Sequence, residues 1–241
     1  MSSRVESVQT PEGPFDLTVW LPDGGTGPGL LLLQEIFGVS DYIEAVAEDL
    51  AGLGYVVAAP DLFWRLKPGH RADHDQEGLT ESLDLSSRFD FAAAVADAGA
   101  ALRTLAALPE VEGGTGVIGF CLGGSIAYFL AAQAELDAVV SYYGSAVHDN
   151  LDILVQIRAP LQFQYGGADP YIPREQVRRV EVAVADHPGA EIHVEEDAGH
   201  AFHNRMAPMF HVPEPAARAW QRTEEFLRRY LPARHAKPPE S

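Results

Sequence analysis

The strongest constraint on this fold is a cysteine framed by glycines in the segment 115–127, TGVIGFCLGGSIA. A short β-branched apolar run ends at Gly119, Cys121 stands between that glycine and Gly123, and an apolar run follows over 126–132. This pattern predicts a strand, a very tight turn and a helix, because glycines let the flanking backbones pass closely. The thiol then stands at the apex, where the helix N-terminus favours an anion. A buried structural cysteine beside a glycine-rich loop is the alternative.

Apolar runs alternate with helical patterns along the rest of the chain. Strands are predicted at 15–20, 29–34, 55–59, 115–119, 138–144, 161–166 and 191–195, and helices at 41–53, 90–108, 126–132, 174–187 and 215–230. This alternation predicts an α/β fold with a mostly parallel central sheet and helices on both faces.

The length of 241 residues fits one medium-large domain. We therefore expect residues 1–231 to form a single domain and residues 232–241 to be a flexible C-terminal tail. Residues 62–86 are polar and irregular, and we expect a long loop there that forms part of a substrate-cavity wall.

Charge and cysteine content restrict the possible partners and compartment. The formal net charge of −18 argues against nucleic acid or an anionic membrane as a partner. One cysteine cannot form an internal disulfide, which fits a reducing compartment. The N-terminus lacks the apolar region of a secretory signal, and the longest strongly apolar run, 30–33, is too short to span a bilayer. We expect a cytoplasmic protein, either a monomer or a small homo-oligomer.

Four reactive side chains follow the ends of predicted strands: Glu35, Cys121, Asp169 and His200. Ligands bind beyond the carboxyl ends of the strands in such a sheet, so these side chains could converge at one edge. His200 can act as the base that activates the Cys121 thiol. Asp169 can accept the other imidazole N–H and fix the tautomer. The order nucleophile, acid, histidine is that of the α/β-hydrolase triad.

The N–H groups of Leu122 and Ile36 are the predicted donors to a developing oxyanion, one after the nucleophile and one in the first strand-to-helix loop. Each side chain of the candidate site also has an ordinary explanation. Asp169 could start a turn, His200 could be a loop histidine, and Glu35 could be a solvated charge. Their joint placement at strand ends, in the triad order, favours a catalytic site.

A second cluster, His70, Asp73, His74 and Asp75, resembles a metal site in composition alone. No H-x-x-x-H or H-E-x-x-H spacing supports metal binding, so we expect a solvated loop. We predict neither a metal nor a cofactor.

Five motifs resemble the dienelactone hydrolase (carboxymethylenebutenolidase) family, and the resemblance extends from about residue 5 to 230. They are QEIFG at 34–38, APDLF at 59–63, GFCLGG at 119–124, YGGAD at 165–169 and GHAFH at 199–203. The resemblance implies the α/β-hydrolase fold and a triad of Cys121, Asp169 and His200. It also implies that Glu35 contacts the thiol at rest and helps take its proton when an anionic substrate enters. A carboxylate and a thiolate side by side repel, so the pair would hold one negative charge.

The resemblance also implies two arginines that hold a substrate carboxylate, and here this chain departs from the family. Gly78 stands nearest to the first expected position, with Arg71 earlier, and Asn204 stands at the second, with Arg205 one residue later. A bidentate arginine clamp does not tolerate such shifts unless the backbone adjusts. The shifts argue against dienelactone itself as the substrate, while Arg71 and Arg205 stay candidate substrate-binding residues. Four aromatic residues are candidates to line the cavity, with core packing as the alternative: Phe37, Trp64, Tyr143 and Phe202.

The functional hypothesis is hydrolysis of a small-molecule lactone or small activated ester through a thiol acyl-enzyme. A thioesterase or another acyl transfer on the same fold is an alternative that the sequence does not separate. A second alternative is a non-catalytic ligand-binding or redox-sensing protein, in which Cys121 is only a reactive thiol.

Overall fold

The computed structural model describes residues 3–233, and its centre is one sheet of eight strands in the order β1-β2-β4-β3-β5-β6-β7-β8. The strands are β1 (Ser3–Thr10), β2 (Gly13–Trp20), β3 (Gly27–Leu33), β4 (Val56–Pro60), β5 (Val111–Phe120), β6 (Ala138–Tyr142), β7 (Leu161–Gly166) and β8 (Ala190–Glu195). The pairs β1–β2 and β2–β4 are antiparallel, and all other neighbours are parallel. The predicted α/β architecture with a mostly parallel sheet is confirmed.

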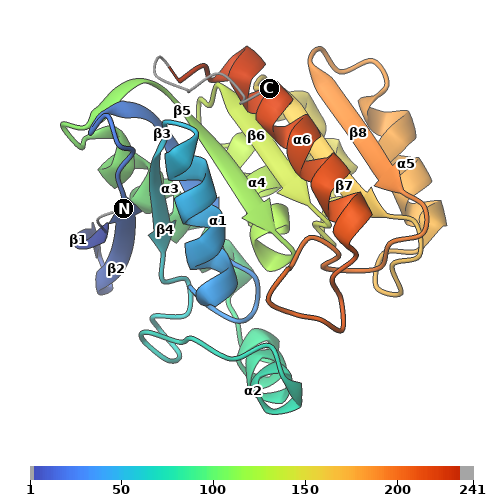
Figure 1. Cartoon of the computed structure of the whole chain (residues 1–241), viewed down its shortest axis with the longest axis horizontal. Helices are drawn as coiled ribbons and strands as arrows, with labels where there is room; N and C mark the ends of the chain where they lie inside the picture. Colours follow the sequence, from blue (N-terminus) through green and yellow to red (C-terminus); the bar gives the residue numbers. More distant parts are fainter. Residues whose placement is uncertain (1–2, 234–241) are drawn as a thin grey trace.

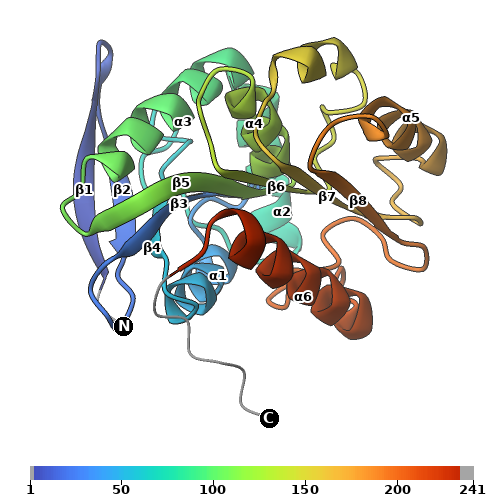
Figure 2. The same ribbon diagram turned by 90° about the horizontal axis from the view of Figure 1, so that it is seen from above.

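Helices cover both faces of this sheet (Figure 2). They are α1 (Asp41–Gly52), α2 (Gln76–Ser87), α3 (Phe91–Ala106), α4 (Leu122–Ala131), α5 (Arg174–Val184) and α6 (Pro213–Tyr230), with a 3₁₀ helix η1 (Leu151–Gln156). Helices α3, α4 and α5 lie on one face, and α1 and α6 lie on the other (Figure 2). Within residues 3–233, no helix combines the length and apolar character that crossing a membrane requires.

The central strands are buried because helices pack on both sides of them. Every residue of β4 is buried, and so is every residue of β3 after its first. A continuous apolar run is the expected sequence of such a strand. These strands end at the lower edge of the sheet in Figure 1, where α2 and the loop between β8 and α6 also lie. Residues that directly follow the parallel strands therefore gather at that edge.

The prediction of an irregular loop over 62–86 is wrong in its second half, because α2 occupies Gln76–Ser87. Asp75 caps this helix by accepting a hydrogen bond from the N–H of Gly78 at 2.8 Å. Gly78 is required there because a Cβ would lie 2.0 Å from the carbonyl oxygen of Asp73. The helix was missed because it buries few apolar side chains and its sequence is mostly polar. Strand β1 and helix η1 were also not predicted, and most of the predicted tail, 234–241, lies outside the described residues.

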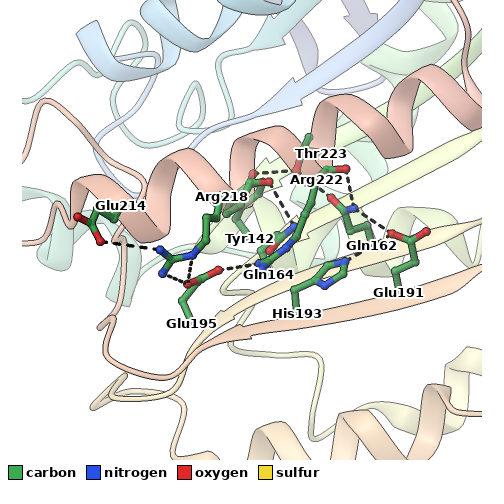
Figure 3. Close-up of polar contacts among 11 residues, drawn as sticks. Tyr142, Gln162, Gln164, Glu191, His193, Glu195, Glu214, Arg218, Arg222 and Thr223 are labelled. Atoms are coloured by element: carbon green, nitrogen blue, oxygen red, sulfur yellow. Dashed lines mark hydrogen bonds and ion pairs between the residues drawn. The ribbon is translucent and has the colours of Figure 1, made fainter.

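A chain of polar contacts fastens α6 to the last strands of the sheet (Figure 3). The hydroxyl of Thr223 donates to Gln162 Oε1 at 2.8 Å and lies 2.8 Å from the hydroxyl of Tyr142. At the end of β8, the carboxylate of Glu195 accepts hydrogen bonds from Arg218 and from Arg222, each at 2.6 Å. Buried polar groups are tolerated only when they are paired, so these contacts define how α6 sits on the sheet. The contacts between Glu195 and the arginines of α6 join the two elements that flank the segment 196–212, which contains His200.

Candidate active site

Cys121 occupies a strained turn between β5 and α4. Its backbone has φ 54° and ψ −111°, which is rare for a residue other than glycine. A Cβ on Gly119 would lie 2.1 Å from the carbonyl oxygen of Gly123, and a Cβ on Gly123 would lie 2.2 Å from that of Leu33. The glycines are therefore needed where three backbone segments meet. The turn leaves the Cys121 side chain partly exposed at the start of α4.

Asp169 and His200 form a hydrogen-bonded pair, although each comes from a different loop at the carboxyl edge of the sheet. His200 Nδ1 lies 2.7 Å from Asp169 Oδ2. The other oxygen of Asp169 accepts the N–H groups of Tyr171 at 2.8 Å and Ile172 at 3.2 Å. Because two backbone N–H groups fix one oxygen, the other is held toward the imidazole. This arrangement leaves His200 Nε2 free to face another partner.

Cys121 is the neighbour that most favours the protonated form of His200. Burial alone would lower the pKa of His200. The interactions with Cys121 and with Asp169 outweigh burial, and they raise the pKa of His200 well above its ordinary value. His200 is therefore well suited to take up a proton beside the thiol, as the base of a cysteine–histidine pair must.

Glu35 lies in the same site as an almost fully buried carboxyl group. Its Oε2 accepts the side-chain N–H of Asn204 at 2.7 Å, and its Oε1 accepts the hydroxyl of Tyr143 at 3.3 Å. Burial raises the pKa of Glu35 to about 7, although both hydrogen bonds and the charge on His200 act in the opposite direction. The carboxyl group can therefore gain or lose a proton near neutral pH.

The predicted oxyanion donors lie next to a bond that joins the two loops carrying them. The N–H of Gly123 donates to the carbonyl oxygen of Gln34 at 3.0 Å. Leu122 directly precedes the donor of this bond, and Ile36 lies two residues beyond its acceptor. Among the described residues, no backbone partner outside the helix and strand pattern engages the N–H of Leu122 or of Ile36. Two such N–H groups near one nucleophile can stabilise a developing oxyanion.

A cavity of about 200 Å³ opens over Cys121. It is lined by Glu35, Ile36, Phe37, Leu79, Leu83, Cys121, Ser145, Tyr171, His200, Ala201 and Phe210. The structure thus brings the nucleophile, the histidine and Glu35 to one opening.

Of the predicted lining aromatics, Phe37 faces this cavity and Trp64 does not. Trp64 stacks on Phe15 with ring centroids 5.6 Å apart, and its indole N–H donates to Asp97 at 2.9 Å. The stacking and this part-buried hydrogen bond hold the Trp64 side chain away from the cavity. Tyr143 and Phe202 are fully buried beneath the site, so they support it from below. The ring centroids of Tyr143 and His200 lie 5.0 Å apart.

Neither predicted arginine reaches the cavity. Arg71 forms ion pairs with Asp41 and Glu44 of α1. Arg205 pairs with Asp49 of the same helix at 2.6 Å. Both guanidinium groups are partly exposed, and neither lines the opening over the thiol. These carboxylates draw the arginines to the outer surface of α1.

The loop expected to be solvated is solvated only in part: Asp73 and Asp75 are exposed, whereas the two histidines are packed inward. The His70 side chain is buried, and that of His74 is 5% exposed. His74 Nε2 lies 3.9 Å from Glu35 Oε2, and the imidazole lies on Phe37 with centroids 4.3 Å apart. Burial lowers the pKa of His74, which favours the neutral ring. Within the described part of the chain, no group of three or more His, Cys, Asp or Glu side chains could hold a metal ion.

Sequence reasoning missed Leu79, Leu83 and Tyr171. The two leucines are four residues apart and follow the capping Asp75, which is a weak signal of one helix face. Tyr171 follows Asp169 by two residues, on the loop that carries the acid. Nothing local to the sequence marks Phe210 as a cavity residue.

Sequence comparisons with known proteins agree on one family. The model of the dienelactone hydrolase family matches residues 15–231. A carboxymethylenebutenolidase from Pseudomonas sp. (strain P51) is 34% identical over 221 residues, which are 91% of this chain and 92% of the relative. One from Pseudomonas putida is 32% identical over 223 residues, covering 92% and 94%. The crystal structure described as "Putative Dienelactone Hydrolase" from Klebsiella pneumoniae superimposes with a TM-score of 0.83 at 28% identity, covering 95% of this chain and 99% of the other.

Proposed function

The chain belongs to the dienelactone hydrolase family and is a lactone or ester hydrolase with the α/β-hydrolase fold; from this premise we propose that it acts through a thioester formed on Cys121. The observation that carries the proposal is that Cys121 and His200 line the same cavity, while Asp169 holds Nδ1 of His200 at 2.7 Å. A carboxylate that fixes an imidazole beside a thiol is the arrangement that acyl transfer to sulfur requires.

In the proposed reaction, Cys121 Sγ attacks the carbonyl carbon, and its proton passes to His200. The N–H groups of Ile36 and Leu122 hold the oxygen that becomes negative. Collapse of the tetrahedral intermediate breaks the bond from carbon to the ester oxygen, which takes the proton from His200. Loss of the alcohol, or opening of a lactone ring, leaves a thioester on Cys121.

Water completes the cycle in a second addition. His200 removes a proton from the water as it attacks the thioester, and the thiolate leaves as the acid is released. Asp169 keeps His200 in the tautomer that both steps need. Glu35, with its pKa near 7, supplies a second group near the thiol that can hold a proton at rest.

The test is turnover of a panel of lactones and aryl esters by the wild type and by Cys121→Ala and His200→Ala. We expect each variant to lose activity by about 10³-fold or more while keeping the wild-type circular dichroism spectrum. Wild-type rates in Cys121→Ala would refute the mechanism. Because Cys121 is the only cysteine in the sequence, alkylation reports on this thiol alone. Alkylation without turnover on any substrate would favour the ligand-binding or redox-sensing alternative.

A further inference from the structure

We propose that the site selects uncharged substrates, namely small lactones or esters that carry an apolar group and no carboxylate. The inference rests on the proposed hydrolytic function and specifies its substrate class. It comes from the charge and polarity of the cavity and from where the nearby cations lie.

Much of the cavity wall is apolar. Phe37, Leu79, Leu83 and Phe210 contribute hydrocarbon surface to a cavity of about 200 Å³. Such a wall stabilises an apolar substituent by removing it from water, and it offers no partner to a charged group. The small volume limits that substituent to a few heavy atoms, since cavities for drug-sized ligands run to ~300–1,000 Å³.

The rim of the cavity is apolar as well. Leu83 is 54% exposed on α2, and Tyr171 is 65% exposed on the loop after β7. Both line the opening over Cys121. Large apolar side chains held in water beside a cavity are typical of surfaces that a ligand covers. α2 stands at the carboxyl edge of the sheet (Figure 1). Its residues Leu79 and Leu83 line the cavity.

The ionisable groups of the site disfavour an anion. Glu35 lies in the wall, and its two hydrogen-bond donors, Asn204 and Tyr143, are uncharged. The positive charge of His200 is already matched by the Asp169 carboxylate at 2.7 Å. When Glu35 is ionised, a substrate carboxylate would enter beside a like charge. When Glu35 is protonated, no lysine or arginine in the cavity wall pairs with that carboxylate, and an unpaired charge in a partly buried site is costly.

The two arginines that the sequence suggested for binding a carboxylate are held elsewhere. Arg71 pairs with two carboxylates of α1, and Arg205 pairs with a third. To reach the cavity, either arginine would have to leave these partners uncompensated. Among residues 3–233, no lysine or arginine lines the cavity.

The test compares two 4-nitrophenyl esters with the same leaving group, the neutral butyrate and the anionic hemisuccinate. We expect the wild-type kcat/KM to favour the butyrate ester by about 100-fold. Leu83→Arg places a cation at the rim and should reduce this preference by about tenfold. Val182→Arg, at a 78% exposed position on α5, adds the same charge elsewhere and should leave the preference unchanged. Equal or faster turnover of the hemisuccinate by the wild type, or an unchanged preference in Leu83→Arg, would overturn the proposal.

A second measurement separates charge selection from hydrolysis. Iodoacetamide and iodoacetate carry the same reacting carbon, and they differ in charge. The quantity compared is the alkylation rate with iodoacetamide divided by the rate with iodoacetate. We expect this ratio to be larger for Cys121 than for free glutathione. Leu83→Arg should reduce the ratio measured for Cys121. If neither ester is hydrolysed, the proposed hydrolytic function fails. The alkylation ratio still shows whether the site prefers an uncharged ligand to an anionic one. A wild-type ratio equal to or below that of glutathione would refute the selection of uncharged ligands.

Discussion

The side-chain amide of Asn204 donates a hydrogen bond to the buried carboxyl group of Glu35 at 2.7 Å, although the two residues are 169 positions apart. The partner is neutral, so the carboxyl group is held in place without a compensating charge. Burial then dominates and raises the pKa of Glu35 to about 7. The protein therefore keeps a destabilising acid beside its candidate nucleophile, which is typical of functional sites.

Glu35→Gln is expected to be more stable than the wild type at pH 8. It should also change how the rate of Cys121 alkylation depends on pH. The folded pKa of about 7 exceeds the ordinary glutamate value of about 4.3, so wild-type stability falls as pH rises through this window. Glu35→Gln removes this titration. The free energy of unfolding of the variant, relative to that of the wild type, should therefore be higher at pH 8 than at pH 4 by about 3 kcal/mol. Urea unfolding at the two pH values measures this difference. The exposed Glu48→Gln is the control, and an equal effect of Glu35→Gln at both pH values would contradict the prediction.

Asp169→Asn is expected to reduce kcat/KM by about 10³–10⁴-fold with little change in fold. The variant keeps an oxygen for the N–H groups of Tyr171 and Ile172, but it no longer stabilises the correct tautomer and the charge of His200. Asp137→Asn is a matched control, because Asp137 also accepts a backbone N–H, that of Thr115, away from the cavity. Steady-state hydrolysis of an aryl ester measures both, and comparable losses in the two variants would argue against a catalytic Asp169.

Gly123→Ala is expected to destabilise the protein by about 3 kcal/mol or more, because the added Cβ would lie 2.2 Å from the carbonyl oxygen of Leu33. Gly99→Ala is the matched control within α3. Its Cβ would meet nothing closer than 3.5 Å, so this variant should gain about 0.5–1 kcal/mol from better helix propensity. Thermal and urea unfolding give both values. Near-wild-type stability of Gly123→Ala would mean that the backbones at the turn can move apart.

Glu195→Gln is expected to lower the free energy of unfolding at pH 7 by about 1–2 kcal/mol. Burial would raise the pKa of Glu195, but the hydrogen bonds from Arg218 and Arg222 outweigh it and lower that pKa. The stabilisation is therefore present above the ordinary glutamate pKa of about 4.3 and is lost as pH falls through the lower folded value. Urea unfolding should show the variant and the wild type converging in acid. The 90% exposed Glu214, which also pairs with Arg218, provides the control Glu214→Gln, which should change little.

The predicted family and α/β-hydrolase fold are confirmed, and the reasons lie in short segments of the sequence. Continuous apolar runs predicted the buried parallel strands, and glycines around Cys121 predicted the tight turn after β5. The residues that follow the strand ends do lie at one edge of the sheet, because parallel strands all have their carboxyl ends at the same edge. Helix α2 escaped prediction because it packs against the site with few apolar residues.

The sequence by itself determined the alternation of the central strands and most helices, and the turn that carries Cys121, because backbone sterics and apolar periodicity act over a few neighbouring residues. Only the tertiary structure decided which groups surround the thiol. Arg71 and Arg205 are held by carboxylates of α1, Asn204 reaches Glu35 from across the fold, and leucines of α2 complete the cavity. Ion pairs, burial and cavity walls depend on segments far apart in the chain, so no local pattern specifies them.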